Sequence, residues 1–132
     1  MTISDRELLA RAAAAAEGSY SPYSSFRVGA ALLTPDGDVL TGANIENAAF
    51  GASVCAETNA ITTAVAAGHR SVSVVAVICL DGDLCTPCGN CRQIMREFGV
   101  ERVVMASKEA ADGTRSVPLS GLLPESFGPE AL

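Results

Sequence analysis

The chain is poor in aromatic and basic side chains. It has no tryptophan, aromatic residues make up 5% of its 132 positions, and nine Lys and Arg stand against 15 Asp and Glu, for a net charge of −6. The core must therefore be built from Ala, Val, Leu and Ile. Nonspecific affinity for nucleic acid comes from cations that contact phosphates. The charge thus argues against nucleic acid as a partner and favours a small, uncharged substrate.

Long apolar runs are lacking as well. No apolar stretch approaches the roughly 20 residues that span a bilayer, and the segment 2–7 is polar. We therefore expect no membrane partner and a cytoplasmic location. The length is that of one ordinary domain, so residues 1–132 are interpreted as a single domain. In a reducing compartment the five cysteines are better explained as metal ligands and core residues than as disulfides.

Alternating helix and strand patterns predict an α/β fold. The expected elements are a helix that starts at a capping box, Ser4 to Glu7, and stops at Gly18, strands at 28–33 and 39–45, a helix at 55–67, a strand at 72–80, a helix at 88–98, a strand at 100–106, a short optional strand at 114–117 and a helical turn at 119–123. The first two strands form a hairpin around Pro35-Asp36-Gly37-Asp38. The helix at 88–98 is a crossover suited to parallel strands. The sequence therefore predicts a mixed sheet with helices on its faces.

Three cysteines form the most informative pattern. Cys55 begins Cys55-Ala56-Glu57, while Cys88 and Cys91 stand in Pro87-Cys88-Gly89-Asn90-Cys91. Both clusters lie at predicted helix starts, where free N–H groups and the helix dipole stabilise thiolates. Three thiolates occupy three corners of a zinc tetrahedron and leave the fourth for water. We therefore predict one catalytic Zn²⁺ per chain.

Glu57 follows Cys55 by two residues on the same predicted turn. It can face the open position of the metal without binding to the metal. As a carboxylate it can take a proton from water, and as an acid it can protonate a ring nitrogen and a departing amine. A first-turn Glu can also simply complement the helix dipole. Beside three thiols at this spacing, the catalytic role is favoured, as in the zinc-dependent nucleobase deaminases.

A zinc ion with three thiolates has a formal charge of −1, which opposes ionisation of its water. We expect Arg92, directly after Cys91, to offset that charge together with the helix ends. The alternative is that Arg92 is a solvated residue on the helix surface.

The other potential ligands are assigned structural roles. Cys79 lies in an apolar run and is expected in the core, and Cys85 is interpreted as a bystander. Cys85 is nevertheless the credible fourth ligand that would close the site. His69 is expected to be solvated, at the far end of the helix that Cys55 starts, about 20 Å away. A thioredoxin-like redox pair would explain the Cys-x-x-Cys but does not require Cys55.

Taken together, the motifs resemble those of the small homotetrameric cytidine deaminases. The resemblance covers nearly the whole chain, and the segments occur in the family's order. The segments that carry it are Ser21-Pro22-Tyr23-Ser24, Phe26-Arg27-Val28-Gly29-Ala30-Ala31, Asn44-Ile45-Glu46-Asn47-Ala48, Cys55-Ala56-Glu57, Pro87-Cys88-Gly89-Asn90-Cys91-Arg92-Gln93 and Leu122-Leu123-Pro124-Glu125-Ser126-Phe127-Gly128-Pro129.

The resemblance implies a three-layer αβα fold, a homotetramer and hydrolysis of cytidine and deoxycytidine to uridine and deoxyuridine with release of ammonia. It implies that Cys55, Cys88 and Cys91 hold zinc and that Glu57 moves protons. By the family's pattern, the substrate-binding residues are Phe26 in the pocket, Asn44 and Glu46 at the ribose 3′-hydroxyl, the Ala56 backbone at the base, and Phe127 reaching the pyrimidine of a neighbouring subunit.

Two positions depart from the family's pattern. Thr58 stands where the family usually has an Arg that hydrogen-bonds the zinc thiolates, so the site is expected to lack one compensating cation. Phe50 stands where a Tyr is frequent, so a hydroxyl is missing. Two rival functions are a zinc deaminase acting on another nucleoside, such as an antibiotic, and a non-enzymatic module with a closed zinc site. Asn44, Glu46 and Phe127 favour ordinary nucleosides.

Overall fold

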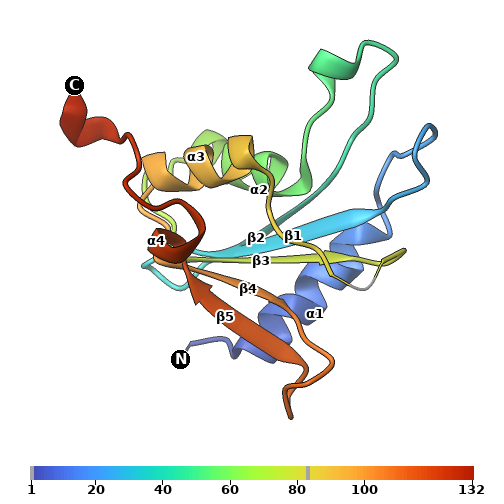
Figure 1. Ribbon diagram of the computed structural model, residues 1–132, viewed down its shortest axis with the longest axis horizontal. Helices are drawn as coiled ribbons and strands as arrows, with labels where there is room; N and C mark the ends of the chain where they lie inside the picture. Colours follow the sequence, from blue (N-terminus) through green and yellow to red (C-terminus); the bar gives the residue numbers. More distant parts are fainter. Residues whose placement is uncertain (1, 83) are drawn as a thin grey trace.

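The structure, a computed structural model, describes residues 2–82 and 84–132 and places helices on both faces of a five-stranded sheet (Figure 1). The elements in chain order are α1 (Asp5–Ala16), β1 (Val28–Leu33), β2 (Val39–Ala43), the 3₁₀ helix η1 (Phe50–Ala52), α2 (Ala56–Ala66), β3 (Val74–Cys79), α3 (Gly89–Glu97), β4 (Arg102–Ala106), β5 (Thr114–Pro118), α4 (Leu119–Leu122) and the 3₁₀ helix η2 (Pro129–Ala131). Helix α1 covers one face, and α2 and α3 cover the other. The predicted three-layer αβα fold is confirmed.

The sheet has the strand order β2-β1-β3-β4-β5. Strands β1 and β2 form the predicted antiparallel hairpin, and β1 also pairs antiparallel with β3. Strands β3 and β4 are parallel, as the crossover through α3 requires. The optional strand at 114–117 is present as β5, an edge strand antiparallel to β4. The predicted mixed sheet is therefore confirmed, while its strand order and the pairing of β1 with β3 go beyond that prediction.

Small apolar residues allow the helices to lie close to the sheet. A Cβ on Gly29 would lie 1.9 Å from the carbonyl oxygen of Ala12 in α1, and a Cβ on Gly42 would lie 2.5 Å from the backbone nitrogen of Ala60 in α2. Val, Leu and Ala side chains fill both layers of the core, and buried Ile and Met side chains join them on the side of α2 and α3. Cys79 is buried among them, as predicted. This close packing fixes the height of α2 above the sheet, and with it the start of that helix.

The helix ends follow local chemistry. The Ser4 hydroxyl accepts a hydrogen bond from the backbone N–H of Glu7 at 3.1 Å, which confirms the predicted cap of α1. Gly68 and Gly99, the predicted stops of α2 and α3, adopt left-handed φ values of +103° and +73° that glycine tolerates best. Cys55 and Cys88 are N-caps, one residue outside the helices that they were expected to begin.

Three predicted strands are too long: the one expected at 72–80 is β3 (Val74–Cys79), the one at 100–106 begins at Arg102, and the third is β2. The strand expected at 39–45 ends at Ala43. At the next position the side-chain oxygen of Asn44 accepts the N–H of Val28 at 2.9 Å, so a side chain takes over one of the bonds that a longer ladder would make. Ile45 lies beyond it in isolated bridges with Tyr20 and Val54. The chain leaves the sheet at Asn44 and can therefore carry polar groups away from the core.

No helix within residues 2–82 and 84–132 is both long and apolar enough to cross a membrane.

The contact of α2 with the sheet can be tested at Gly42. In Gly42→Ala the added methyl group meets backbone atoms of Ala56 and Ala60, so we expect the free energy of unfolding to fall by about 1–3 kcal/mol, as for other overpacked sites. Gly51→Ala is the matched control, because a Cβ at Gly51 meets nothing within 4 Å. Urea unfolding of the two variants measures the difference, and equal stabilities would contradict the close approach.

Candidate metal centre and active site

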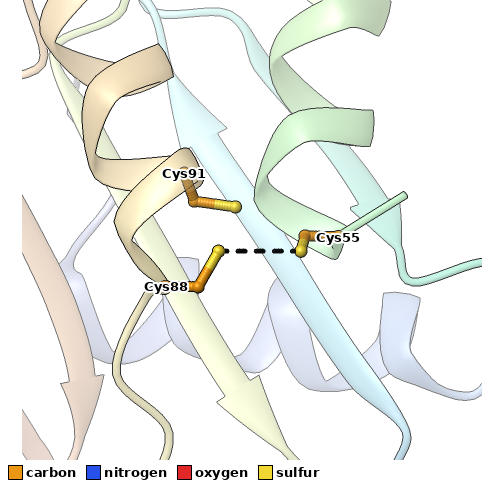
Figure 2. A group of neighbouring side chains, drawn as sticks. All are labelled: Cys55, Cys88 and Cys91. Atoms are coloured by element: carbon orange, nitrogen blue, oxygen red, sulfur yellow. Dashed lines mark hydrogen bonds between the residues drawn. The ribbon is translucent and has the colours of Figure 1, made fainter. Parts of the chain in front are cut away.

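Three sulfur atoms converge where α2 and α3 begin. The Sγ atoms of Cys55, Cys88 and Cys91 all lie within 4.8 Å of one another, and those of Cys55 and Cys88 are 3.8 Å apart. Figure 2 shows the three side chains pointing toward one another, Cys55 from the start of α2 and the other two from the start of α3. Cys91 is buried, whereas Cys55 and Cys88 are exposed. The group is thus open on one side.

The electrostatics of the group favour a bound cation. Burial raises the pKa of the Cys55 thiol, and the neighbouring Cys88 raises it further. Burial and the nearby Glu57 carboxylate raise the pKa of Cys91. Burial also opposes ionisation of Cys88, but hydrogen bonds from the backbone and sulfur of Cys91 outweigh it and lower the pKa. A divalent cation would stabilise all three thiolates together, and sulfur ligands in this number suit zinc.

Glu57 lies directly beside the sulfurs. Its side chain is nearly buried, with the residue 5% exposed. Burial raises the pKa of its carboxyl group, while bonds from its own backbone and from the Cys91 sulfur oppose that shift. Glu57 is therefore a buried carboxyl group beside the sulfurs and not a solvated partner of the helix dipole.

Three cavities adjoin the sulfur group, and two of them are lined by sequence-predicted site residues besides the cysteines. One, of about 260 Å³, is lined by Phe26, Ala56 and Glu57 together with Cys55 and Cys88. The other, of about 460 Å³, is lined by Glu46 and Phe50 among others. Asn44 and Cys55 line both, so the cavities are neighbours. The structure therefore brings together the sequence-predicted metal, proton-transfer and pocket residues, with the exception of Arg92 and Phe127.

Asn44 and Glu46 hold a loop over these cavities. Asn44 accepts from the Val28 N–H at 2.9 Å and donates to the Phe26 carbonyl at 2.9 Å. Glu46 accepts the backbone N–H groups of Tyr23 and Ser24 at 2.9 and 3.1 Å, and also the Ser24 hydroxyl. The Ser24 bond is the main cause of the lowered pKa of Glu46.

Sequence reasoning missed this loop anchoring. The one local signal is that the hydroxyls of residues 20–24 and Pro22 are typical of a turn that needs side-chain partners.

Thr58 contacts the sulfur group through its hydroxyl. Its Oγ1 lies 3.5 Å from the Sγ of Cys91, and this hydrogen bond opposes the rise in the pKa of Cys91. The sequence predicted a lost cation at this position. The structure shows that Thr58 instead supplies a neutral donor, which stabilises a thiolate without adding charge.

Arg92 and Phe127 lie outside the cavities. Arg92 donates from Nε to the Pro87 carbonyl at 2.8 Å and from a terminal nitrogen to the Leu122 carbonyl at 2.7 Å. It therefore contacts the backbone of the loop that leads into Cys88. Phe127 is 62% exposed. Its backbone carbonyl accepts a hydrogen bond from the side-chain amide of Gln93 at 2.9 Å.

The remaining potential ligands stay outside the sulfur group. Cys85 lines the smaller cavity but does not belong to the metal-binding group found in the described part of the chain; burial raises its pKa to about 12. His69 is not the solvated residue that the sequence suggested. Its side chain is only 19% exposed, and its Nε2 lies 3.4 Å from the Asp38 carboxylate.

Comparison with known proteins identifies the arrangement. Residues 2–107 match the family described as the cytidine and deoxycytidylate deaminase zinc-binding region. The chain belongs to this deaminase family. It is 42% identical over 127 residues to the cytidine deaminase of Halalkalibacterium halodurans, with 96% of each chain covered. Zinc is therefore the metal for which this three-sulfur group is arranged.

Solved cytidine deaminases have the same fold. The crystal structure of the enzyme from Burkholderia pseudomallei is similar with a TM-score of 0.85 and 40% identity, over 95% of this chain and 100% of that one. The structure from Mycobacterium tuberculosis gives a TM-score of 0.83 and 36% identity, over 96% and 98% of the respective chains. The deaminase fold thus accounts for the whole arrangement of sheet and helices.

The ligand set can be tested by removing single thiols. Cys88→Ala should lose its zinc, because two thiolates hold the ion far less tightly than three, and the protein should be less stable since metal binding supports folding. Cys85→Ala is the matched control and should keep one zinc per chain. Elemental analysis of the purified variants measures both. Zinc retained by Cys88→Ala, or lost from Cys85→Ala, would contradict the three-sulfur site.

The Thr58 hydroxyl generates a second test. Thr58→Val keeps the shape of the side chain and removes the donor to Cys91, so we expect zinc affinity to fall by about 10-fold, at the low end for groups that support metal ligands. Thr62→Val, on the exposed part of the same helix, should leave the affinity unchanged. Competition with a chromophoric chelator gives both affinities. The same affinity in both variants would leave the hydroxyl without a role at the metal.

Proposed function

We propose that the protein catalyses hydrolytic deamination of cytidine and 2′-deoxycytidine to uridine and 2′-deoxyuridine, with release of ammonia, as a cytoplasmic enzyme of pyrimidine salvage. The observation that carries this proposal is the nearly buried Glu57 carboxyl group beside three converging sulfurs, at the wall of a cavity. The relatives named cytidine deaminase support the choice of substrate. The chain would act as a single catalytic domain, residues 1–132.

In this proposal Glu57 moves every proton of the reaction. Zinc, held by Cys55, Cys88 and Cys91, would lower the pKa of the attacking water. A Glu57 oxygen takes the proton of that water as the oxygen forms its bond to C4 of the base. Glu57 gives this proton to N3, then takes the second proton of the former water from the hydroxyl now on C4 and passes it to the 4-amino group. As the C4=O bond forms, the C4–N bond breaks and ammonia leaves. A pKa raised by burial suits this role, because the carboxyl group can hold the proton between transfers.

The cavities suit an uncharged nucleoside. The Phe26 ring and the Ala56 backbone would contact the base beside Glu57, while Asn44 and Glu46 would bind the ribose 3′-hydroxyl in the neighbouring cavity. Asn44 keeps one amide N–H and Glu46 one acceptor position after their bonds to the loop. Among the described residues that line the two cavities there is no Lys or Arg to bind a phosphate. This favours nucleosides over nucleotides.

Arg92 would support the metal site indirectly, through the loop that precedes Cys88. Its two bonds to the Pro87 and Leu122 carbonyls fix the loop that places the Cys88 sulfur, and its positive charge stands one residue from Cys91. We therefore propose that Arg92 offsets thiolate charge while it braces this loop.

We further propose that the chain assembles as a homotetramer and that Phe127 contacts the substrate of a neighbouring subunit. Exposed large apolar residues support this: Phe50 is 80% exposed, Phe127 62% and Leu132 96%. Phe127 lines neither cavity of its own chain. Such residues are typical of surfaces that another protein covers.

The proposed chemistry is tested by Glu57→Gln, which keeps the side-chain shape and removes the proton carrier. We expect turnover of cytidine to fall by at least about 10²-fold with the zinc content unchanged, while Glu109→Gln on an exposed loop stays fully active. Loss of ultraviolet absorbance together with ammonia release measures turnover, and a chelator should abolish it in the wild type. Near-normal turnover by zinc-loaded Glu57→Gln, or no uridine from the wild type, would refute the proposal.

A further inference from the structure

The C-terminal arm, residues 123–132, is fastened to α3 by side chains of that helix. Arg96 donates from Nε to the Ser126 hydroxyl at 2.8 Å and forms an ion pair with Glu130. Gln93 donates from Nε2 to the Phe127 carbonyl at 2.9 Å. The arm extends beyond α3 and away from the sheet (Figure 1). The bonds therefore fix a segment that projects from the body of the protein.

Arg96, Gln93 and Gly128 form a clamp on the C-terminal arm, and Gly128 shows how tightly this clamp is packed. A Cβ at Gly128 would lie 2.5 Å from both Cζ and a terminal nitrogen of Arg96, and 2.7 Å from a carboxylate oxygen of Glu130. The φ angle of Gly128 is −146°, which any residue adopts. The constraint at this position is consequently one of space. The Arg96 guanidinium lies against the backbone of Gly128. Its own partners, the Ser126 hydroxyl and the Glu130 carboxylate, lie on the two sides of Gly128 in the chain.

The clamp holds an exposed aromatic side chain. Phe127 lies between Ser126 and Gly128, both held at Arg96, and its own carbonyl is bound by Gln93. The residue is nevertheless 62% exposed. Ordering an apolar residue in solvent contributes little to the stability of a monomer. Ordering Phe127 in advance does, however, reduce the conformational entropy that is lost when its ring enters a partner's pocket.

The same helix connects the arm to the metal group. Cys88 caps α3 and Cys91 lies in its first turn, while Gln93 and Arg96 follow on the next turns. Gln93 also lines a cavity of about 330 Å³ together with Cys55 and Thr58. The position of the arm is thus set by the element that positions two of the three sulfurs.

We propose that Arg96 is a positioning residue for the deamination: together with Gln93 and Gly128 it holds the C-terminal arm so that Phe127 enters the substrate cavity of a second copy of this chain. This inference rests on the proposed function. Arg96 itself touches neither substrate nor metal and acts through Phe127.

The first experiment separates substrate binding from chemistry. Arg96→Ala and Gly128→Ala each open the clamp, the first by removing the guanidinium and the second by displacing it. We expect KM for cytidine to rise by roughly 10-fold, an effect in the range of small misplacements of a substrate contact, with kcat at saturation, zinc content and melting temperature close to wild type. Arg11→Ala, on the exposed face of α1, is the control with unchanged KM. The double variant with Arg96→Glu and Glu130→Arg should recover part of the lost affinity.

The second experiment asks whether the arm acts between subunits. Glu57→Gln chains, which keep an intact arm, are co-expressed with Arg96→Ala chains, which keep an intact site, and hybrids are isolated through two different tags. Sedimentation establishes their assembly. In the hybrids the active Arg96→Ala sites should recover a near-wild-type KM, because they receive Phe127 from their neighbours.

The outcomes separate the two proposals. A wild-type KM in both Arg96→Ala and Gly128→Ala, or hybrids with the KM of Arg96→Ala alone, would overturn the clamp while leaving the deaminase function intact. A zinc-loaded wild type that forms no uridine would overturn the proposed function and this inference with it.

Discussion

The whole site depends on the close approach of α2 to the sheet, because this contact brings the Cys55 sulfur to the two sulfurs of α3. Gly42 leaves room for the backbone of Ala60 to lie against β2. Cys55 caps this helix, and Glu57 lies in its first turn. A helix displaced by a methyl group would move a metal ligand and the proposed proton carrier together. Small residues at the sheet surface are therefore as necessary to the chemistry as the cysteines.

At the metal group, burial opposes ionisation of the thiols and neutral hydrogen-bond donors favour it. Burial raises the pKa of Cys91 and of Glu57, while the Thr58 hydroxyl and the backbone of Cys91 stabilise thiolates. The guanidinium of Arg92 is engaged with carbonyls behind the Cys88 loop. A site built in this way keeps its open side free for a substrate, because no long cationic side chain has to reach the sulfurs from the front.

The sequence predicted the main helices and strands, the β1–β2 hairpin, the parallel β3–β4 pair and the cysteines of the metal group, because periodicity, caps and the spacing of three cysteines are local signals. It could not predict contacts between residues distant in the chain. The bond from Thr58 to Cys91, the anchoring of the 23–24 loop by Glu46 and the partner of His69 each depend on how helices and loops meet in space. The early end of β2 has the same cause, since the Asn44 side chain replaces a ladder bond to Val28.

The central claim is that zinc is held by three cysteines, with its remaining position open for chemistry beside Glu57. X-ray absorption at the zinc edge of the purified protein counts the sulfur ligands directly. The account predicts three sulfurs at about 2.3 Å and one lighter ligand, with the same spectrum for Cys85→Ala. Four sulfurs around the zinc in the wild type, with one lost in Cys85→Ala, would show a closed site and contradict the account.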